Sequence, residues 1–356
     1  MQRALFLAAK GRNFVLPNPM VGAVIVRDGR IIGEGWHERF GGDHAEVAAL
    51  KNAAENVEGA TIYVTLEPCS HQGKTPPCCE ALVQAKIKKV VAAMEDPNPA
   101  VAGRGLQMLK NAGVEVVCGV KAGEAKSLNQ AFIKFIKTER PYVVLKAAQT
   151  LDGRIADANG ASKWITGPDA RTWVHALRSE SNAVLIGSGT AIADNPSLTV
   201  RRVEGRQPLR VVLDRRLRIA ENASLLTDGA QDQTIIFFSI AEENEKKRER
   251  IAKAGCRLIA LPEGGAEEHL KFVLQKLGSL GVAQVLVEGG TEIFSAFLQY
   301  DLADKIAVFI APKIFGKGGP AFSIPGFTAE APLKFSNYAW RQISDDLLFE
   351  SELKEY

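Results

Sequence analysis

The sequence has few cysteines and no long apolar run. Its 356 residues include five cysteines, an odd number at low density, which excludes a disulfide-held scaffold and favours a reducing compartment. The longest stretch without a charged residue, residues 13–26, contains Pro17 and Pro19 and is shorter than the roughly 20 residues of a membrane span. The apolar residues Ala4–Ala9 are too few for a secretory signal. We therefore expect a cytoplasmic protein outside the membrane.

Charge of one sign is also scarce. The chain has 44 Lys and Arg residues against 41 Asp and Glu residues, which gives a net charge of +3, and its aromatic content is only 7%. An enzyme that acts on nucleic acid needs a basic channel and aromatic side chains on which bases stack. We therefore expect a small-molecule substrate and no nucleic-acid partner.

Two regions of different character follow each other along the chain. Four of the five cysteines and three of the five histidines lie before residue 140. A charged stretch, Lys134–Arg140, ends at Pro141, and the apolar run Tyr142–Leu145 then predicts a new strand. The length agrees with two domains of roughly 150 residues or more, and we place them at residues 1–140 and 141–356.

Strands alternate with helices in both regions, which predicts α/β domains. The first region is expected to contain a hairpin, Val21–Arg27 and Arg30–Gly35, that turns at Asp28-Gly29. Its other expected elements are helices at 44–56, 79–88 and 105–112 and strands at 60–66, 89–94 and 114–117. The second region is expected to contain strands at 142–147, 183–186, 209–213, 234–238, 285–287 and 305–310 and helices at 168–179, 242–254, 267–277 and 292–299.

A possible catalytic zinc site is formed by one histidine and two cysteines. His44 lies at an expected helix start, Cys69 follows a strand, and Cys78 lies at the start of the next helix. Three protein ligands leave the fourth tetrahedral position of zinc for water, as in catalytic sites. A helix start lowers the pKa of a thiol and so favours a thiolate ligand. Cys79 competes with Cys78, but adjacent helical residues point about 100° apart, and we favour Cys78.

Glu46 follows His44 by two residues and is not needed as a ligand. A carboxylate there can carry a proton from water to a leaving amine, which is its role in the H-x-E … P-C-x-x-C signature of zinc deaminases. Residues 70–77 lengthen the spacing between Cys69 and Cys78 beyond that signature. Two alternatives remain: the cysteines could be buried apolar residues, or a structural zinc could be closed by Cys79 or His71.

The motifs of the first region closely resemble those of a known family, the bifunctional riboflavin-biosynthesis deaminase–reductases. The matching segments are Asn18-Pro19-x-Val21-Gly22-Ala23, His44-Ala-Glu46 and TLEPCSHQGKTPPCC at 65–79, which includes the long cysteine spacing. The resemblance extends over essentially the whole chain. It implies a cytidine-deaminase-like α/β/α sandwich that hydrolytically deaminates 2,5-diamino-6-ribosylamino-pyrimidinone 5′-phosphate at ring carbon 2. Asn18 would orient the pyrimidine.

Polar residues near the cysteines are candidates for the ribose phosphate. Ser70, His71, Lys74 and Thr75 offer donors suited to a phosphate, although they also fit a plain polar loop. Asp96 and Asn98 could hold the ribose hydroxyls, or could simply form a turn with the prolines that follow them. His37 could line the pocket or be a structural histidine.

The second region resembles the reductase domain of the same family. The matching segments are LKAAQTLDGRIA at 145–156, SKWIT at 162–166, GSGTAIADNPSLTVR at 187–201 and VEGGTEIF at 287–294. The resemblance implies a dihydrofolate-reductase-like α/β domain, NADPH-dependent reduction of the ribosyl group to ribityl, and a homo-oligomer assembled through the reductase domains. Independently, the Gly289-Gly290 turn before an expected helix could bind a pyrophosphate at the helix start.

The resemblance also assigns roles to individual residues of this region. Asp194 would supply the proton that accompanies hydride, although it could instead cap a turn before Pro196. Lys146 could face the reacting centre or reach solvent, and Arg215 and Arg216 could pair with the 2′-phosphate of NADPH. The implied substrate residues are Ser162, Arg178, Leu198, Arg201 and Glu288. The implied cofactor contacts are Ala148, Trp164, Thr190, Asp194, Gly290, Thr291, Glu292, Ile293, Phe294 and Ser295.

Two rival functions stay open at this point. The first is a zinc deaminase of another nucleobase or of nucleic acid, with an inactive or structural second domain. The second is a non-catalytic protein in which zinc only stabilises the fold.

Overall fold

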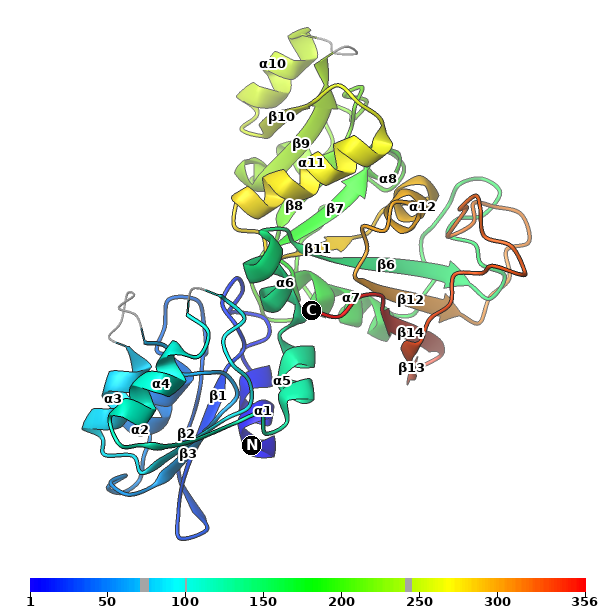
Figure 1. Ribbon diagram of the computed structural model, residues 1–356. Coiled ribbons are helices and arrows are strands. Elements are labelled where there is room, and N and C mark those ends of the chain that lie inside the picture. Colours follow the sequence, from blue (N-terminus) through cyan, green and yellow to red (C-terminus); the bar gives the residue numbers. More distant parts are fainter. Residues whose placement is uncertain (71–76, 100, 241–244) are drawn as a thin grey trace. The chain divides into compact units, whose positions relative to one another are not determined.

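A computed structural model describes residues 1–70, 77–99, 101–240 and 245–356 (Figure 1). The chain divides into two compact units, one of residues 1–139 with Tyr356 and the other of residues 140–355. Within the described residues, no helix combines the length and the apolar character that are needed to cross a membrane.

Among the described residues, the first unit contains a five-stranded sheet and six helices, and the second a nine-stranded sheet, six helices and a short 3₁₀ turn. The elements of the first unit are α1 (Gln2–Ala9), β1 (Gly22–Arg27), β2 (Arg30–Trp36), α2 (Ala45–Lys51), β3 (Thr61–Val64), α3 (Cys78–Gln84), β4 (Lys89–Ala92), α4 (Arg104–Asn111), β5 (Glu115–Cys118), α5 (Ala122–Leu128) and α6 (Gln130–Thr138). Those of the second are β6 (Tyr142–Thr150), α7 (Pro168–Glu180), β7 (Ala183–Gly187), α8 (Ser188–Asp194), β8 (Leu209–Leu213), α9 (Ser224–Thr227), η1 (Gln231–Gln233), β9 (Thr234–Ser239), α10 (Glu245–Lys253), β10 (Arg257–Leu261), α11 (Ala266–Ser279), β11 (Gln284–Val287), α12 (Thr291–Gln299), β12 (Lys305–Ala311), β13 (Asn337–Ile343) and β14 (Asp346–Glu352).

The sheet of the first unit has the strand order β2-β1-β3-β4-β5. Strand β1 is antiparallel to β2 and β3, whereas β3, β4 and β5 are parallel. The predicted hairpin is confirmed: Asp28 and Gly29 both have positive φ, 50° and 75°, as a tight turn between twisted strands requires. Ala23 and Ile25 belong to the core beneath α2, α3 and α4, while Val24 packs with α1 on the other face.

Helix α2 lies unusually close to strand β2, and this contact fixes the position of His44 and Glu46. A Cβ atom added to Gly35 would lie 2.3 Å from the backbone nitrogen of Ala49 and 2.6 Å from the carbonyl of Ala45. Only glycine therefore fits at this position. The small side chains of Ala45 and Ala49 face the core and have no exposed surface.

The second unit has the strand order β10-β9-β8-β7-β11-β6-β12-β14-β13. Along this order, every pair of neighbouring strands from β10 through to β12 is parallel. Strand β14 is antiparallel to β12, and β13 is antiparallel to β14. Helices α11 and α12 bury their apolar sides in a core with Leu145, Leu185 and Val287. In a parallel sheet, ligands bind beyond the carboxyl ends of the strands, and β7 and β11 end here at Gly187 and Val287.

Several predicted boundaries need correction. The helix expected at 44–56 ends at Lys51, because the chain then turns so that the Ala54 amide can bond to the Ile32 carbonyl of β2 (2.8 Å). The helix expected at 79–88 begins at Cys78 and ends at Gln84, shortly before Lys86, whose φ is +52°. The helix expected at 242–254 is observed as Glu245–Lys253, and residues 242–244 lie outside the described part. The observed elements that were not predicted are α1, α5, α6, α8, α9, η1, β10, β13 and β14.

Candidate zinc and reductase sites

His44, Cys69 and Cys78 come from three separate elements and converge on one point. His44 immediately precedes α2, Cys69 lies in the loop after β3, and Cys78 is the first residue of α3. The Nδ1 atom of His44 lies 3.2 Å from the Sγ atom of Cys78 and 3.5 Å from that of Cys69. Tetrahedral zinc places such ligand atoms about 3.5 to 3.8 Å apart. The donor set therefore fits zinc with only small adjustments.

The surroundings of the two cysteines stabilise negative charge on sulfur. The backbone N–H of Cys78, at the start of α3, donates to the Sγ atom of Cys69 (3.3 Å). Hydrogen bonding from the Cys78 thiol lowers the pKa of Cys69 to about 4, while the same interaction raises the pKa of Cys78. Thiolate is the form that binds zinc, so one ligand is already prepared for the metal.

Cys79 points away from this cluster. Its thiol donates to the carbonyl oxygens of Pro68 (3.2 Å) and Gly105 (3.4 Å), and its side chain is fully buried. Burial raises the pKa of Cys79 to about 12, which keeps it a neutral thiol. Of the two adjacent cysteines, only Cys78 therefore belongs to the group of ligand atoms that lie within 4.8 Å of one another.

Glu46 lies in the first turn of α2 and is only 3% exposed. Burial raises the pKa of its carboxyl group to about 7. A carboxyl group with a pKa near neutrality can both accept and release a proton at working pH. The structure thus places a buried carboxyl group near His44, in the position where the H-x-E spacing predicts the proton carrier.

A second histidine fixes the orientation of Asn18. The Nδ1–H group of His37 donates to the Asp43 carbonyl (2.9 Å), which leaves Nε2 to accept a hydrogen bond from the Asn18 amide (3.1 Å). The ring of His37 is 3% exposed and meets that of His44 edge-on, with centroids 5.8 Å apart. His37 therefore connects Asn18 to the surroundings of His44.

Glu67 was missed by the sequence analysis. Its buried carboxylate accepts four backbone N–H groups, from Asp96 (3.1 Å), Gly103 (2.9 Å), Gly105 (2.8 Å) and Leu106 (3.2 Å). It therefore joins the loop of the zinc ligand Cys69 to the start of α4. The only signal in the sequence was an acidic residue two positions before Cys69.

The loop containing Asp96 and Asn98 forms a local turn. Asp96 Oδ1 accepts the backbone N–H of Asn98 at 2.8 Å, so one carboxylate oxygen is engaged within the loop. The predicted phosphate residues His71 and Lys74 lie outside the described residues.

The second unit contains a cavity of about 790 Å³, here called the larger cavity, between the ends of β7 and β8 and the start of α12. Its volume lies in the usual range for cofactor sites. Three arginines, Arg215, Arg216 and Arg218, line it together with His269; Arg218 and His269 were not predicted. The predicted residues in its wall are Ser162, Thr190, Asp194, Gly290, Thr291, Glu292 and Ile293.

A second cavity of about 460 Å³, the smaller cavity, shares Ser162, Thr190, Asp194 and Gly290 with the larger one. The other predicted residues in its wall are Ala148, Trp164, Arg178, Leu198, Arg201, Glu288 and Phe294. Ser295 lines neither cavity; it is 6% exposed, and its hydroxyl oxygen accepts the backbone N–H of Ser323. Trp164 is 59% exposed and stacks with Arg171 at 4.5 Å, so it is not a core tryptophan.

Arg178 and Glu288 form a bidentate ion pair in the smaller cavity. Arg178 donates from Nε (2.6 Å) and Nη2 (3.0 Å) to the two oxygens of Glu288. Lys146 is half-buried and lines the same cavity, and desolvation lowers the pKa of its amine. Arg178 and Glu288, which were predicted as two separate substrate contacts, are thus bound to each other.

Asp194 ends helix α8 where the two cavities meet. Its Oδ1 atom accepts the hydroxyl of Ser162 (2.7 Å), and its carbonyl accepts the amine of Lys163 (2.8 Å). The hydroxyl of Ser162 therefore fixes the direction of the carboxylate.

These two sites define a class of protein, a zinc-dependent deaminase joined to a reductase. The zinc-binding region model of cytidine and deoxycytidylate deaminases matches residues 1–94, and the RibD C-terminal domain model matches residues 141–349. The chain belongs to the RibD family of riboflavin biosynthesis proteins, which are bifunctional deaminases and reductases, and its cofactors are Zn²⁺ and NADPH.

The relatives of this chain match it over almost its full length. It is 43% identical to the riboflavin biosynthesis protein RibD of Aquifex aeolicus, over 98% of this chain and 96% of the relative. The RibD protein of Escherichia coli is 42% identical over 93% of each chain. Among solved structures, Acinetobacter baumannii RibD superposes with a TM-score of 0.89 at 42% identity, covering 99% of this chain and 97% of the other. The deaminase/reductase of Thermotoga maritima has a TM-score of 0.87, the same identity and the same coverage. Both predicted domain folds are thereby confirmed.

The geometry predicts different metal contents for two neighbouring serine variants. Cys78→Ser should lose zinc because an alcohol does not replace a thiolate ligand at neutral pH. Cys79→Ser should keep close to one zinc per chain, because its hydroxyl can still donate to the Pro68 and Gly105 carbonyls. Zinc is measured by atomic emission after gel filtration. Equal zinc loss in both variants would contradict the assignment.

His175 predicts a pH dependence of stability. Burial, together with the charge of Arg178, lowers its pKa from 6.5 to about 4. Because the unfolded chain binds this proton first, the contribution of His175 to stability is present above pH 6.5 and is lost as pH falls toward 4. Between pH 7 and 5, the free energy of unfolding should fall by about 2 kcal/mol more in the wild type than in His175→Gln.

This difference is measured by urea unfolding followed by tryptophan fluorescence, to which the second unit contributes three of the four tryptophans. Glutamine can still accept the Arg201 N–H that His175 Nδ1 accepts at 3.2 Å. Parallel pH profiles of the two proteins would show that His175 is not held neutral.

Proposed function

We propose that residues 1–140 deaminate 2,5-diamino-6-(5-phosphoribosylamino)pyrimidin-4-one by hydrolysis and that residues 141–356 reduce the ribosyl group of the product to ribityl with NADPH. The observation that carries the proposal is the convergence of His44, Cys69 and Cys78 next to buried Glu46. The reaction names printed for the Thermotoga maritima relative, a diaminohydroxyphosphoribosylaminopyrimidine deaminase and 5-amino-6-(5-phosphoribosylamino)uracil reductase, support this choice of substrate.

In the deaminase site, His44, Cys69 and Cys78 hold the metal. When bound there, zinc would supply an activated water for attack on ring carbon 2 of the pyrimidine. Glu46 takes a proton from that water at its carboxylate and delivers it to the leaving amino group, which departs as ammonia. Asn18, held by His37, orients the pyrimidine ring. Asp96, Asn98, His71 and Lys74 bind the ribose phosphate.

In the reductase site, the larger cavity binds the cofactor, with Thr190 and the start of α12 around the pyrophosphate. When bound there, NADPH would supply the hydride for carbon 1 of the ring-opened ribose. Asp194, held by Ser162, supplies the accompanying proton. Glu288, fixed by Arg178, faces the sugar, and Arg201 with Leu198 completes the substrate wall.

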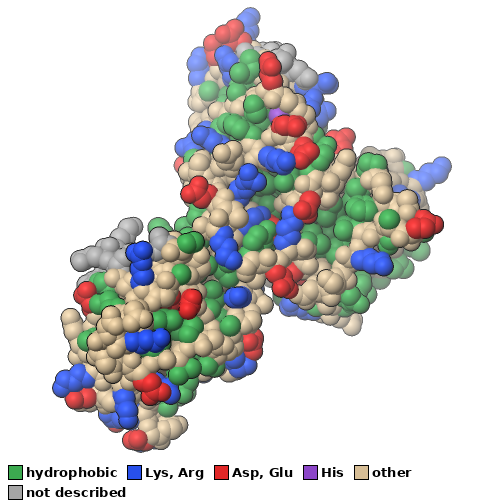
Figure 2. Space-filling view, in the orientation of Figure 1, with side chains coloured by type: hydrophobic (Ala, Val, Ile, Leu, Met, Phe, Trp, Pro, Cys, Tyr) green, Lys and Arg blue, Asp and Glu red, His purple; other side chains and the backbone are tan. Residues whose placement is uncertain are grey.

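We further infer that the chain acts on a free small molecule in the cytoplasm. Basic and acidic side chains are interspersed on the face shown in Figure 2, which suits a small substrate better than a nucleic acid. The zinc thiolates require a reducing compartment. Self-association through the reductase units is part of the proposal, and sedimentation velocity at micromolar concentration tests it.

The proposal is tested by following ammonia release and NADPH oxidation separately on the diaminopyrimidinone ribosyl phosphate. Glu46→Gln should lower the rate of ammonia release by about a hundredfold or more, because the proton carrier is lost. It should keep zinc, and it should still oxidise NADPH when supplied with the deaminated substrate. Retained deamination, or zinc loss in this variant, would remove Glu46 from its proposed role.

Arg215 and Arg216 are proposed to contact the 2′-phosphate of NADPH from the wall of the larger cavity. Replacing either by alanine should raise KM for NADPH roughly tenfold to a hundredfold, the loss expected for a hydrogen bond between charged groups. KM for NADH should stay nearly unchanged. Arg257→Ala, in β10 and outside both cavities, is the matched control. Equal losses with both cofactors would show that the arginines have no role in this selectivity.

A further inference from the structure

The segment of residues 195–201, which follows helix α8, has an irregular backbone. Among the described residues, no backbone-to-backbone hydrogen bond outside the helices and strands involves residues 196–201. Asn195 and Leu198 have left-handed φ values of 40° and 53°, which cost free energy in residues other than glycine. Something other than the segment's own backbone must therefore hold this shape.

Two side chains of helix α7 hold the end of the segment. Arg178 donates from Nη1 to the carbonyl of Thr199 (3.1 Å), and His175 Nδ1 accepts the backbone N–H of Arg201 (3.2 Å). Both side chains also line the smaller cavity.

Gln207 holds the same segment from outside the cavities. Its Oε1 atom accepts the backbone N–H of Val200 at 2.8 Å, and its Nε2 atom donates to the Val200 carbonyl at 2.7 Å. One amide side chain thus replaces both hydrogen bonds that a neighbouring strand would have made. Gln207 itself is exposed, so the chain could replace it without disturbing the core.

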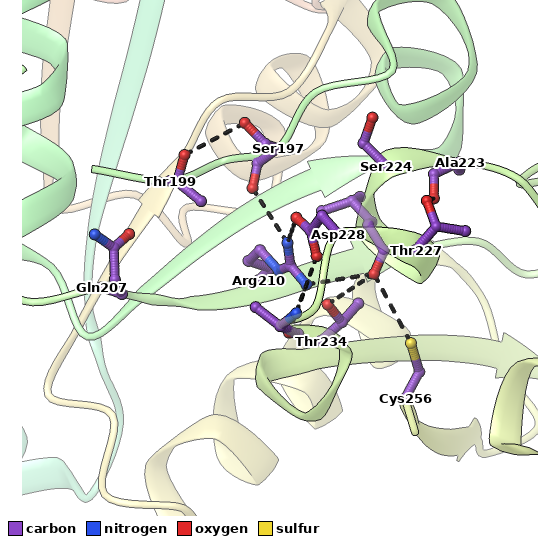
Figure 3. Close-up of polar contacts among 12 residues, drawn as sticks. Ser197, Thr199, Gln207, Arg210, Ala223, Ser224, Thr227, Asp228, Thr234 and Cys256 are labelled. Atoms are coloured by element: carbon purple, nitrogen blue, oxygen red, sulfur yellow. Dashed lines mark hydrogen bonds and ion pairs between the residues drawn. The ribbon is translucent and has the colours of Figure 1, made fainter. Parts of the chain in front are cut away.

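Arg210 holds the middle of the segment from β8, as Figure 3 shows. It donates from Nη1 to the Ser197 carbonyl at 3.4 Å. Its guanidinium is only 2% exposed, forms an ion pair with Asp228, and donates from Nη2 to the carbonyls of Leu225 (3.3 Å) and Ala230 (2.6 Å). Arg210 therefore ties the segment to the turn around α9.

The same turn also holds the start of the segment. Asn195 Oδ1 accepts the backbone N–H of Ser224, the first residue of α9, at 2.8 Å. Side-chain hydrogen bonds thus hold residues 195–201 at both ends and in the middle.

We propose that Gln207 and Arg210, which line neither cavity, are positioning residues for the reductase substrate. The segment that they hold carries Leu198 and Arg201 into the wall of the smaller cavity and directly follows Asp194. Fixing this backbone in advance removes the cost of ordering it when the sugar phosphate binds. This inference rests on the proposed function of the smaller cavity as the substrate site.

The test uses Gln207→Ala in the full chain with zinc bound, and Gln275→Ala, on an exposed position of α11, as the matched control. Gln207→Ala should raise KM for the deaminated ribosyl substrate roughly tenfold, since small misplacements of binding groups are costly. The dissociation constant of NADPH, the deaminase rate and the melting temperature should stay within experimental error of the control. Unchanged KM would overturn the proposal, and so would a parallel loss of all four properties.

Hydrogen exchange provides a readout that does not depend on activity. In Gln207→Ala, the amide of Val200 should exchange at least tenfold faster than in the wild type and in Gln275→Ala, because its acceptor is gone. Arg210→Lys, which keeps the charge but has fewer donors, should speed exchange across residues 195–201. Unchanged exchange in both variants would overturn the inference. If exchange is faster in the variants but the wild type does not oxidise NADPH with the deaminated substrate, only the proposed function is overturned.

Discussion

The deaminase site depends on the close contact between helix α2 and strand β2. Gly35 allows the backbone of α2 to approach to a distance at which any side chain would collide with Ala45 and Ala49. Since His44 and Glu46 lie at the start of this helix, their positions relative to Cys69 and Cys78 follow from that contact. A ligand sphere for zinc tolerates errors of only about 0.2 Å in its distances, so the packing of small residues sets the geometry of the metal site.

The zinc site could be predicted from the sequence because its signals are local. His44, Cys69 and Cys78 each adjoin the start of a helix or the end of a strand, and Glu46 is tied to His44 by a fixed spacing. The sequence favoured Cys78 over Cys79 only by a preference, and the physical reason required the structure, because it depends on which carbonyls lie near the second sulfur. Glu67 could not be predicted, since its four partners lie 29 to 39 positions further along the chain.

Fewer contacts of the reductase unit could be predicted from the sequence, because they join residues that lie far apart along the chain. The pairing of Arg178 with Glu288 joins residues 110 positions apart, so no local pattern indicates it. The exposed strand β13 has no apolar alternation that would distinguish it from a loop. The family motifs located the walls of both cavities, but the side chains that hold those walls, such as Gln207 and Arg210, lie outside the motifs. Resemblance locates the residues that line a cavity better than those that support them.

In the proposed deaminase site, where Asn18 orients the pyrimidine, the hydrogen bond between His37 and Asn18 determines which edge of a ligand Asn18 can bind. His37 already uses one amide hydrogen of Asn18, and within the described part of the chain the Asn18 side chain has no other partner. What Asn18 offers a ligand is therefore one donor next to one acceptor, the pattern complementary to a lactam edge. Ring systems that lack such an edge, including simple alkylated pyrimidines, would leave a polar pair unsatisfied in the pocket. Compounds that combine a lactam edge with a zinc-binding group would match both features of this pocket.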